Sequence, residues 1–239
     1  MDAAAVVAEE GGPGAALGRY VEILTSRGIE WGLIGPREAD RLWDRHVLNS
    51  LAIEPFVPAG ARVLDVGSGA GLPGVPLALA RPDVTVTLLE PLLRRWRFLV
   101  GVVEELGLGA RVEARRGRAE ECSGVFDVVT CRAVAPLATL VGWCAGLVAD
   151  GGRLVVLKGR SAASEVASAK KAFDELGWSV AVHEVVPTGC TEPTWVIAAG
   201  RGVSRETARA AVNGFGRGDR SRKSTVDSSP THLRGGRGE

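Results

Sequence analysis

The stretch that most constrains the fold is Val63–Gly74, which reads VLDVGSGAGLPG. Residues suited to a buried strand lead into a glycine-rich turn, and a helical pattern follows from Val75. Glycine tolerates positive φ and has no Cβ, so the backbone of such a turn can lie directly against a ligand. The stretch therefore predicts a strand, a ligand-binding turn and a helix in succession.

A second apolar strand, 84–89, follows this helix and ends in Glu90. An acid at the end of the strand after a glycine-rich turn is placed to accept hydrogen bonds from ribose hydroxyls. The two features together predict a cofactor that contains a nucleoside.

The register of the glycines distinguishes between cofactors. After Asp65 the turn reads GxGxG, which resembles the first motif of class I S-adenosylmethionine-dependent methyltransferases; its glycines are Gly67, Gly69 and Gly71. Two other interpretations stay open, because residues 69–74 also fit the G-x-G-x-x-G pattern of dinucleotide sites and because the turn can serve packing alone. We expect S-adenosyl-L-methionine, bound by Asp65, the three glycines and Glu90.

The chain alternates between strand and helix patterns from residue 62 onward. The expected strands are 62–66, 84–90, 111–115, 126–130, 152–157, 178–185 and 194–200, and the expected helices lie at about 73–81, 92–107, 137–149 and 163–177. Such alternation requires a mainly parallel sheet covered on both faces, and the last two strands suit an antiparallel hairpin at one edge. The pattern predicts an α/β fold with a seven-stranded, mostly parallel sheet.

Four segments are expected along the chain. Residues 1–14 are expected to be disordered, and 15–55 to form a helical extension with helices at 15–26 and 37–51. The methyltransferase domain is expected at 56–203. The remainder, 204–239, is rich in glycine, serine and arginine, which predicts a flexible basic tail.

The composition is that of a globular protein, with 46% hydrophobic and 24% charged residues. Neither a signal peptide nor a membrane-spanning stretch is visible, and the four cysteines lack C-x-x-C spacing. We therefore expect a cytoplasmic protein with reduced thiols, no metal site and no membrane contact. Arginines cluster between Arg94 and Arg118 although the net charge is only +1, which indicates a nucleic-acid substrate or, alternatively, a solvated helix face.

Further candidates follow the third, fourth and fifth expected strands, where ligands bind in an open α/β sheet. Ala119 and Glu120 are placed to meet an adenine through a backbone N–H and a carboxylate, with a solvated helix start as the alternative. Arg132 is placed to pair with the methionine carboxylate or to lie near the acceptor base, with a structural ion pair as the alternative. Lys158 ends the fifth strand.

Four segments together resemble the RsmG (GidB) family, bacterial enzymes that methylate N7 of a guanosine in 16S ribosomal RNA. They read RLWDRHVLNSL (41–51), VLDVGSGAGLPGVPLA, FDVVTCRAVAPL and LVVLKG, within residues 17–200. The resemblance implies the class I methyltransferase fold, which is Rossmann-like, with an N-terminal helical extension. It also implies cofactor-binding roles for Gly67, Leu72, Ala119, Glu120 and Arg132.

The resemblance further implies a set of basic residues near the RNA or the reaction centre, namely Arg94, Arg118, Arg132 and Lys158. We assign catalytic roles to Arg132 and Lys158. Arg95, which completes a basic pair, and His46, on the polar face of its helix, are further candidates for RNA contact; a packing or surface role is the alternative for His46. The sequence departs from the family pattern at Asn49, where aspartate is usual.

The implied chemistry is methyl transfer to a nitrogen that carries a lone pair and no proton. No general base is needed, so catalysis reduces to orientation, which supplies roughly 7–11 kcal/mol in well-aligned systems. The expected partner is 16S rRNA or a small ribosomal subunit particle, and the enzyme is expected to be a monomer. Two alternatives remain: methylation of pyrimidine C5 with Cys131 as nucleophile, and a non-catalytic RNA-binding module with the same fold.

Overall fold

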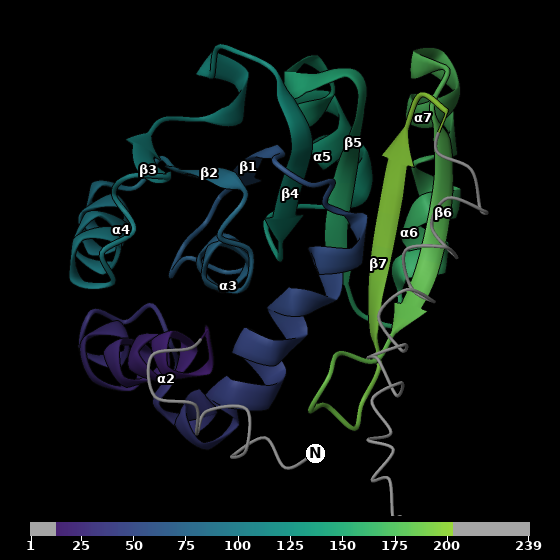
Figure 1. Cartoon of the computed structure of the whole chain (residues 1–239). Coiled ribbons are helices and arrows are strands. Elements are labelled where there is room, and N and C mark those ends of the chain that lie inside the picture. The colour runs from purple at the N-terminus through teal and green to yellow at the C-terminus, as the bar shows by residue number, and fades with distance from the viewer. Residues whose placement is uncertain (1–12, 203–239) are drawn as a thin grey trace, which may run out of the picture.

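Strands at the predicted places form one sheet in the computed structural model, which describes residues 13–202 (Figure 1). The seven strands are β1 (Arg62–Val66), β2 (Thr85–Glu90), β3 (Val112–Arg116), β4 (Phe126–Arg132), β5 (Val148–Lys158), β6 (Ser179–Val185) and β7 (Thr194–Gly200). Their order in the sheet is β3-β2-β1-β4-β5-β7-β6. β7 pairs antiparallel with β5 and β6, and the other pairs are parallel. The predicted mostly parallel sheet and its antiparallel edge hairpin are confirmed.

The helices between the strands also follow the predicted order. They are α3 (Gly74–Ala80), α4 (Leu93–Glu105), α5 (Leu137–Cys144), α6 (Ala162–Ser168) and α7 (Lys170–Leu176), with the 3-10 turns η5 (Ala119–Glu121) and η6 (Ala145–Leu147). The helix expected at 137–149 ends earlier, because β5 already begins at Val148 to pair with Phe126. The helix expected at 163–177 is divided at Ala169, where ψ turns to 1°.

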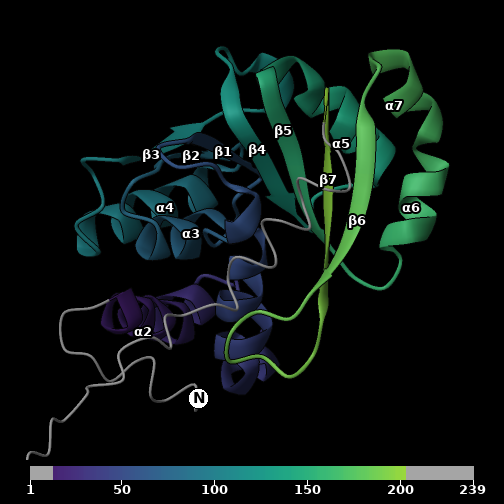
Figure 2. The ribbon, with the colours of Figure 1, turned by 45° about the vertical axis from the view of Figure 1, so that its right-hand side comes forward.

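Helices cover both faces of the sheet (Figures 1 and 2). α3 and α4 lie on one face, and α5, α6 and α7 lie on the other. Each face has its own apolar core, and neighbouring residues of a strand enter the two cores in turn: Val63 belongs to the first core and Leu64 to the second. Apart from Arg62, β1 is buried throughout, as expected for the centre of a doubly covered sheet.

The residues before the sheet form a helical region that packs against α3 (Figure 2). It consists of α2 (Pro13–Ile23), η1 (Leu24–Gly28), η2 (Pro36–Arg41), η3 (Trp43–Leu48) and η4 (Leu51–Phe56). We refer to residues 13–56 as the N-terminal segment. Its helices extend beyond the predicted 15–26 and 37–51, since η1 reaches Gly28 and η4 reaches Phe56.

The N-terminal segment shares the first core with α3 and α4. Tyr20 of α2 is fully buried, and its hydroxyl donates a hydrogen bond to the backbone oxygen of Ala70 at 2.8 Å. Because Ala70 belongs to the glycine-rich turn, this bond anchors the N-terminal segment directly on that turn.

Apart from residues 13 and 14, the predicted disordered N-terminus lies outside the described residues, as does the predicted tail 204–239.

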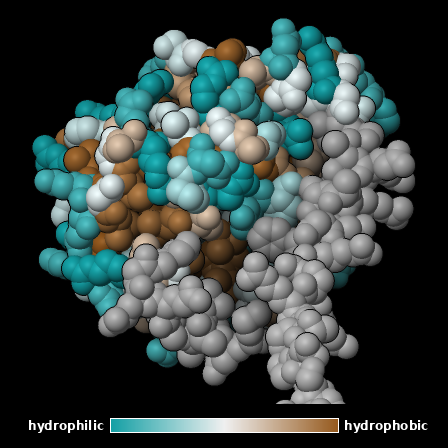
Figure 3. Space-filling view, viewed as in Figure 1, coloured by the Kyte–Doolittle hydropathy of each residue, from teal (hydrophilic) through white to brown (hydrophobic). Residues whose placement is uncertain are grey.

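The described surface mixes hydrophilic and hydrophobic residues on the face seen in Figure 3. Between residues 13 and 202, no helix combines the length and apolar character needed to cross a bilayer. In the same range, no three His, Cys, Asp or Glu side chains are grouped so as to hold a metal ion.

Gly74, the first residue of α3, has no room for a side chain. A Cβ there would meet Leu88 of β2 and lie 2.7 Å from Asp65 Oδ2. We expect Gly74→Ala to lower the free energy of unfolding by about 1–3 kcal/mol, the usual effect of overpacking. In the control Gly142→Ala, in α5, nothing lies within 4 Å of the new Cβ, and helix propensity should raise stability by up to about 1 kcal/mol. Urea unfolding measures both, and equal stabilities would contradict the prediction.

Candidate functional site

The carboxyl ends of the parallel strands bring the predicted site residues to one edge of the sheet. The register pairs Arg132 of β4 with Leu157 of β5, and Lys158 with Trp195 of β7. The order along this edge is therefore the glycine-rich turn after β1, then Arg132, Lys158 and the start of β7. On the other side of β1, β2 ends in Glu90. The strand order thus gathers residues that are far apart in the sequence.

The glycine-rich turn holds three residues in positive-φ conformations, with φ of +68° at Gly67, +58° at Gly69 and +103° at Gly71. A Cβ at Gly71 would lie 2.7 Å from Val75 Cγ2 and 3.0 Å from the Tyr20 hydroxyl, so packing also requires glycine there. Gly69 is less crowded, because the nearest atom to an added Cβ lies at 3.8 Å. The turn therefore leaves backbone accessible at Gly69.

Glu90 ties this turn to the start of α4. Its Oε2 accepts a hydrogen bond from the Gly69 N–H at 3.0 Å, and its Oε1 accepts one from the Leu92 N–H at 3.0 Å. The residue is 2% exposed. The sequence predicted a ribose acceptor at Glu90, and the structure shows a carboxylate that bridges two backbone amides. Each oxygen keeps a second lone pair with which it can accept from a hydroxyl.

Asp65 is fully buried beneath the turn. Its Oδ2 accepts a hydrogen bond from the Gly74 N–H at 3.0 Å, whereas its Oδ1 has no hydrogen-bond partner within the described residues. Burial raises the pKa of Asp65 to about 7, although the hydrogen bond from Gly74 acts in the opposite direction. The environment of Asp65 therefore favours a protonated carboxyl group below neutral pH.

The remaining predicted cofactor residues lie around the same turn and the neighbouring strand ends. Leu72 is in the turn itself and packs against the first core. Ala119 begins η5 after β3 and is buried, whereas Glu120 beside it is exposed. Since Glu90 pairs with Arg116 at the end of β3, this 3-10 turn follows directly beside β2. The cofactor roles of these three residues stay predictions.

The predicted RNA-contacting arginines lie at the β2–β3 end of this edge. Arg94 and Arg95 are exposed in the first turn of α4, and the Arg94 guanidinium lies 6.0 Å from the centre of the Trp31 ring. Arg118 is exposed directly before η5. The three side chains present positive charge to solvent, which is compatible with the predicted contact.

The guanidinium of Arg132 is bound to the N-terminal segment. Its Nη1 donates to the His46 backbone oxygen at 3.0 Å and to the Ser50 hydroxyl at 3.3 Å, and its Nη2 donates to the Arg45 backbone oxygen at 3.1 Å. Burial lowers the pKa of Arg132. The arginine that was predicted to be catalytic therefore also joins β4 to η3.

The His46 ring lies between Arg132 and Glu38. Its Nδ1 is 2.9 Å from Arg132 Nη2, and its Nε2 is 3.0 Å from Glu38 Oε2. A guanidinium only donates, so Nδ1 accepts and the proton on Nε2 is donated to Glu38. Burial lowers the pKa of His46, which favours this neutral form. Both ring nitrogens are thus engaged within the protein, which agrees with the packing role given as the alternative for His46; its contact with RNA stays a prediction.

The loop after β4 lies over the glycine-rich turn. Ala133 has φ of +54°, which is uncommon for a residue other than glycine and indicates a locally constrained backbone. Val134 reaches the turn, where its Cγ2 would lie 2.8 Å from a Cβ on Gly67. The Lys158 ammonium donates to the Ala135 backbone oxygen at 3.0 Å. The lysine predicted to be catalytic therefore holds this loop in place.

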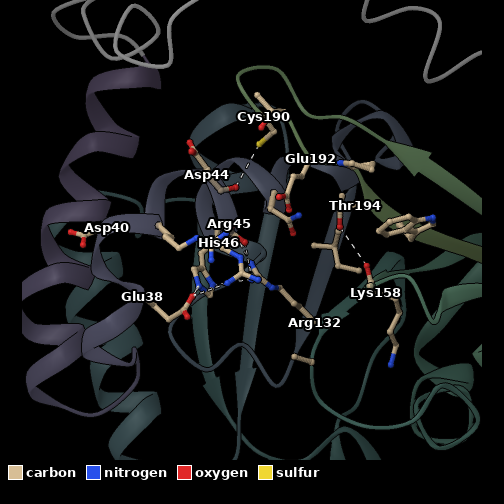
Figure 4. Close-up of a pocket in the computed structure, with 18 residues that line it drawn as sticks. Glu38, Asp40, Asp44, Arg45, His46, Arg132, Lys158, Cys190, Glu192 and Thr194 are labelled. Carbon is tan, nitrogen blue, oxygen red and sulfur yellow. Dashed lines mark hydrogen bonds and ion pairs between the residues drawn. The ribbon is translucent and has the colours of Figure 1, made fainter.

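A pocket of about 550 Å³ opens where the N-terminal segment meets the ends of β4, β5 and β7 (Figure 4). We call it the edge pocket. It is lined by residues of η2 and η3, by Arg132 and Ala133, by Lys158, and by residues 190–195 before and at the start of β7. The sequence had indicated Arg132, Lys158 and His46 of this lining but not residues 190–195, which read as a turn and the start of the last strand.

Cys131, the nucleophile of the pyrimidine-C5 alternative, is fully buried in the second core. Burial raises the pKa of its thiol well above the usual value. A nucleophilic cysteine needs both a thiolate and access to its substrate. Nothing in the surroundings of Cys131 favours that alternative.

Asp65 makes the stability of the fold depend on pH. An unfolded aspartate loses its proton near a pKa of about 3.9, whereas the folded Asp65 keeps its proton up to about pH 7. Its contribution to stability is therefore full below the unfolded pKa and is lost as the pH rises to about 7. Asp65→Asn removes this titration, so we expect the variant to gain stability relative to the wild type over that range. Urea unfolding at several pH values measures the difference, and a constant difference would contradict the prediction.

Comparison with known proteins places the chain in a family. The family described as GidB, rRNA small subunit methyltransferase G, matches residues 14–189. A Kineococcus radiotolerans protein named ribosomal RNA small subunit methyltransferase G is 50% identical over 200 residues, which cover 82% of this chain and 79% of that protein. A protein of the same name from Mycolicibacterium smegmatis is 47% identical over 214 residues, covering 86% of this chain and 88% of that protein.

A solved structure supports the fold. The B. subtilis M1A22 tRNA methyltransferase TrmK matches with a TM-score of 0.51 at 16% identity, over 70% of this chain and 72% of that one. This likeness concerns the fold alone, and it agrees with the class I methyltransferase arrangement predicted from the sequence. The glycine-rich turn and the site at the strand ends agree with this fold. The family match over residues 14–189, most of the chain, shows that the chain belongs to the GidB family of rRNA small subunit methyltransferases.

Proposed function

We propose that the protein transfers the methyl group of S-adenosyl-L-methionine to N7 of a guanosine in 16S rRNA. The observation that carries the proposal is the match to the GidB family over residues 14–189. The relatives compared above are named as methyltransferases of small-subunit ribosomal RNA. Gly67, Glu90 and Arg132 are all present and lie at one sheet edge, which favours an enzyme over a non-catalytic module of the same fold.

The glycine-rich turn and its surroundings suit this cofactor. The Gly69 N–H donates to the Glu90 carboxylate, so glycine backbone without a side chain lies beside a hydrogen-bond acceptor. A ribose site requires both features next to each other. Asp65 fixes the start of α3 below the turn, and we assign Leu72, Ala119 and Glu120 to the adenosine side. When bound, the cofactor supplies an electrophilic methyl group on a positively charged sulfur.

The side chains of the edge pocket orient the acceptor base. Guanine N7 has no proton to lose, so no side chain has to act as a base, and alignment is what remains to be supplied. Arg132 lines the edge pocket, and its four Nη–H donors are taken by the N-terminal segment. We assign its Nε–H, which no described residue engages, to contact with the acceptor. Lys158, at the same pocket, holds the loop that crosses the glycine-rich turn. His46 acts on Arg132 as a positioning residue.

The exposed arginines extend the proposed RNA contact beyond the pocket. Guanidinium groups pair bidentately with phosphate, and Arg94, Arg95 and Arg118 are free to meet the backbone of a bound RNA. We propose that the partner is 16S rRNA or a small ribosomal subunit particle. We also propose that the protein acts as a monomer in the cytoplasm.

A bacterial strain that lacks its own GidB-family gene tests the proposal. Mass mapping of its 16S rRNA should show one guanosine without its methyl group, and expression of this protein should restore it. Expression of Arg132→Ala should restore at least about tenfold less methylation of this guanosine than the wild type, because one arginine contact to the acceptor is lost. The control Arg62→Ala removes an exposed arginine that pairs with Asp127 at the opposite end of β1, and it should restore methylation fully. An unmethylated guanosine in the strain expressing the wild-type protein would contradict the proposal.

Cys131→Ala separates N7 methylation from the pyrimidine-C5 alternative. Because the thiol is buried and protonated, we expect methyl transfer by this variant to stay near the wild-type rate. Cys144→Ala, which truncates a buried cysteine in α5, is the matched control for the loss of core packing. A rate loss of roughly a hundredfold or more in Cys131→Ala alone would support a nucleophilic cysteine instead.

A further inference from the structure

The edge pocket is lined by charges of both signs. Its acidic side chains are Glu38, Asp40, Asp44 and Glu192, and its basic side chains are Arg41, Arg45, Arg132 and Lys158. Carboxylates repel phosphate, so a pocket that held only phosphate would not place four of them in its wall. The lining suits a neutral ring with hydrogen-bond donors on one edge and acceptors on another.

The four carboxylates differ in their availability. Glu38 already accepts from His46 at 3.0 Å and faces Arg45 at 3.8 Å. Asp40 points away from the other labelled residues, whereas Glu192 lies between Asp44 and Thr194 (Figure 4). Within residues 13–202, no hydrogen bond or ion pair engages the Glu192 carboxylate. Glu192 is exposed on the loop before β7, so its carboxylate is available to accept hydrogen bonds from a ligand.

Glu192 also lies on the side of the pocket that is remote from the glycine-rich turn. The strands follow one another along the edge in the order β1, β4, β5, β7, and Glu192 lies just before β7 begins at Thr194. Two strand spacings, about 10 Å, separate β4 from β7. A purine fits in that interval, and the Trp195 indole in the pocket lining offers an aromatic surface on which an RNA base can stack.

We propose that the edge pocket binds the acceptor guanine and that Glu192 accepts hydrogen bonds from its N1–H and its 2-amino group. These donors lie on the edge of the purine opposite N7. Their contact with Glu192 therefore turns N7 toward β4, β1 and the glycine-rich turn. The inference rests on the proposed function and adds the residue that selects and orients the base.

The same contact discriminates against adenine. Adenine has no proton on N1 and no 2-amino group, so it would place a nitrogen lone pair against the carboxylate. A site built to hydrogen-bond a donor strongly rejects an analogue that lacks it, because the polar group of the site is then left unpaired. Glu192 thus accounts for base choice as well as for orientation.

The test uses the full-length protein and RNA acceptors that carry guanosine or inosine at the target nucleotide. Inosine keeps N7 and N1–H but lacks the 2-amino group. The wild type should prefer guanosine by about tenfold in kcat/KM. In Glu192→Gln the amide oxygen still accepts from N1–H, whereas the amide NH2 faces the 2-amino group of guanosine. The variant should therefore lower kcat/KM for guanosine by about tenfold and change the value for inosine by less than about threefold, so that the preference disappears. Glu184→Gln, which neutralises an exposed carboxylate in β6 before the same loop, should keep the preference.

Calorimetry with S-adenosyl-L-methionine should give the same affinity for all three proteins, because Glu192 is not part of the cofactor site. A guanosine preference retained by Glu192→Gln, or an equal loss on both acceptors, would overturn the role of Glu192 while the proposed function stands. Loss of the preference in Asp44→Asn but not in Glu192→Gln would also overturn it. If the wild type methylated N7 of neither acceptor, the proposed function itself would fail.

Discussion

The hydrogen bonds between the Arg132 guanidinium and the backbone oxygens of Arg45 and His46 hold the two halves of the site together. A half-buried guanidinium requires acceptors for its donors, and η3 supplies them from 87 and 86 residues away in the sequence. The edge pocket exists because these two regions meet, since one of its walls belongs to the N-terminal segment and the other to the ends of β4, β5 and β7. Without the N-terminal segment, the ends of β4, β5 and β7 would lack the opposite wall of the pocket.

The glycine-rich turn and the edge pocket are neighbours because the short loop after β4 contacts both. Ala133 lines the pocket, and the next residue, Val134, packs on Gly67. Lys158 holds the same loop through the Ala135 backbone oxygen. A methyl donor over the turn and a base in the pocket would therefore face each other across this loop. The positive φ of Ala133 is the local conformation that lets the loop make both contacts.

Much of the fold could be predicted from the sequence. The alternation of strand and helix patterns indicated the seven strands and their class, because a strand such as β1 that is buried on both faces is mainly apolar, here at Val63, Leu64 and Val66. Prediction was less accurate for helix ends: the N-terminal helices run past their expected limits and one helix is divided at Ala169. Those ends depend on packing against other elements, which local sequence does not encode.

The sequence by itself determined the family, the glycine-rich turn with Glu90, and the presence of Arg132 and Lys158 at strand ends, because each follows from residue type and short-range spacing. Only the tertiary structure decided what these side chains contact. It brought Glu38, Ser50 and Glu192 to the site, showed His46 bonded to Arg132 rather than open to solvent, and buried Cys131. The contacts of Arg132 join residues more than 80 positions apart, and they arise only when burial of the two cores has fixed where each element lies.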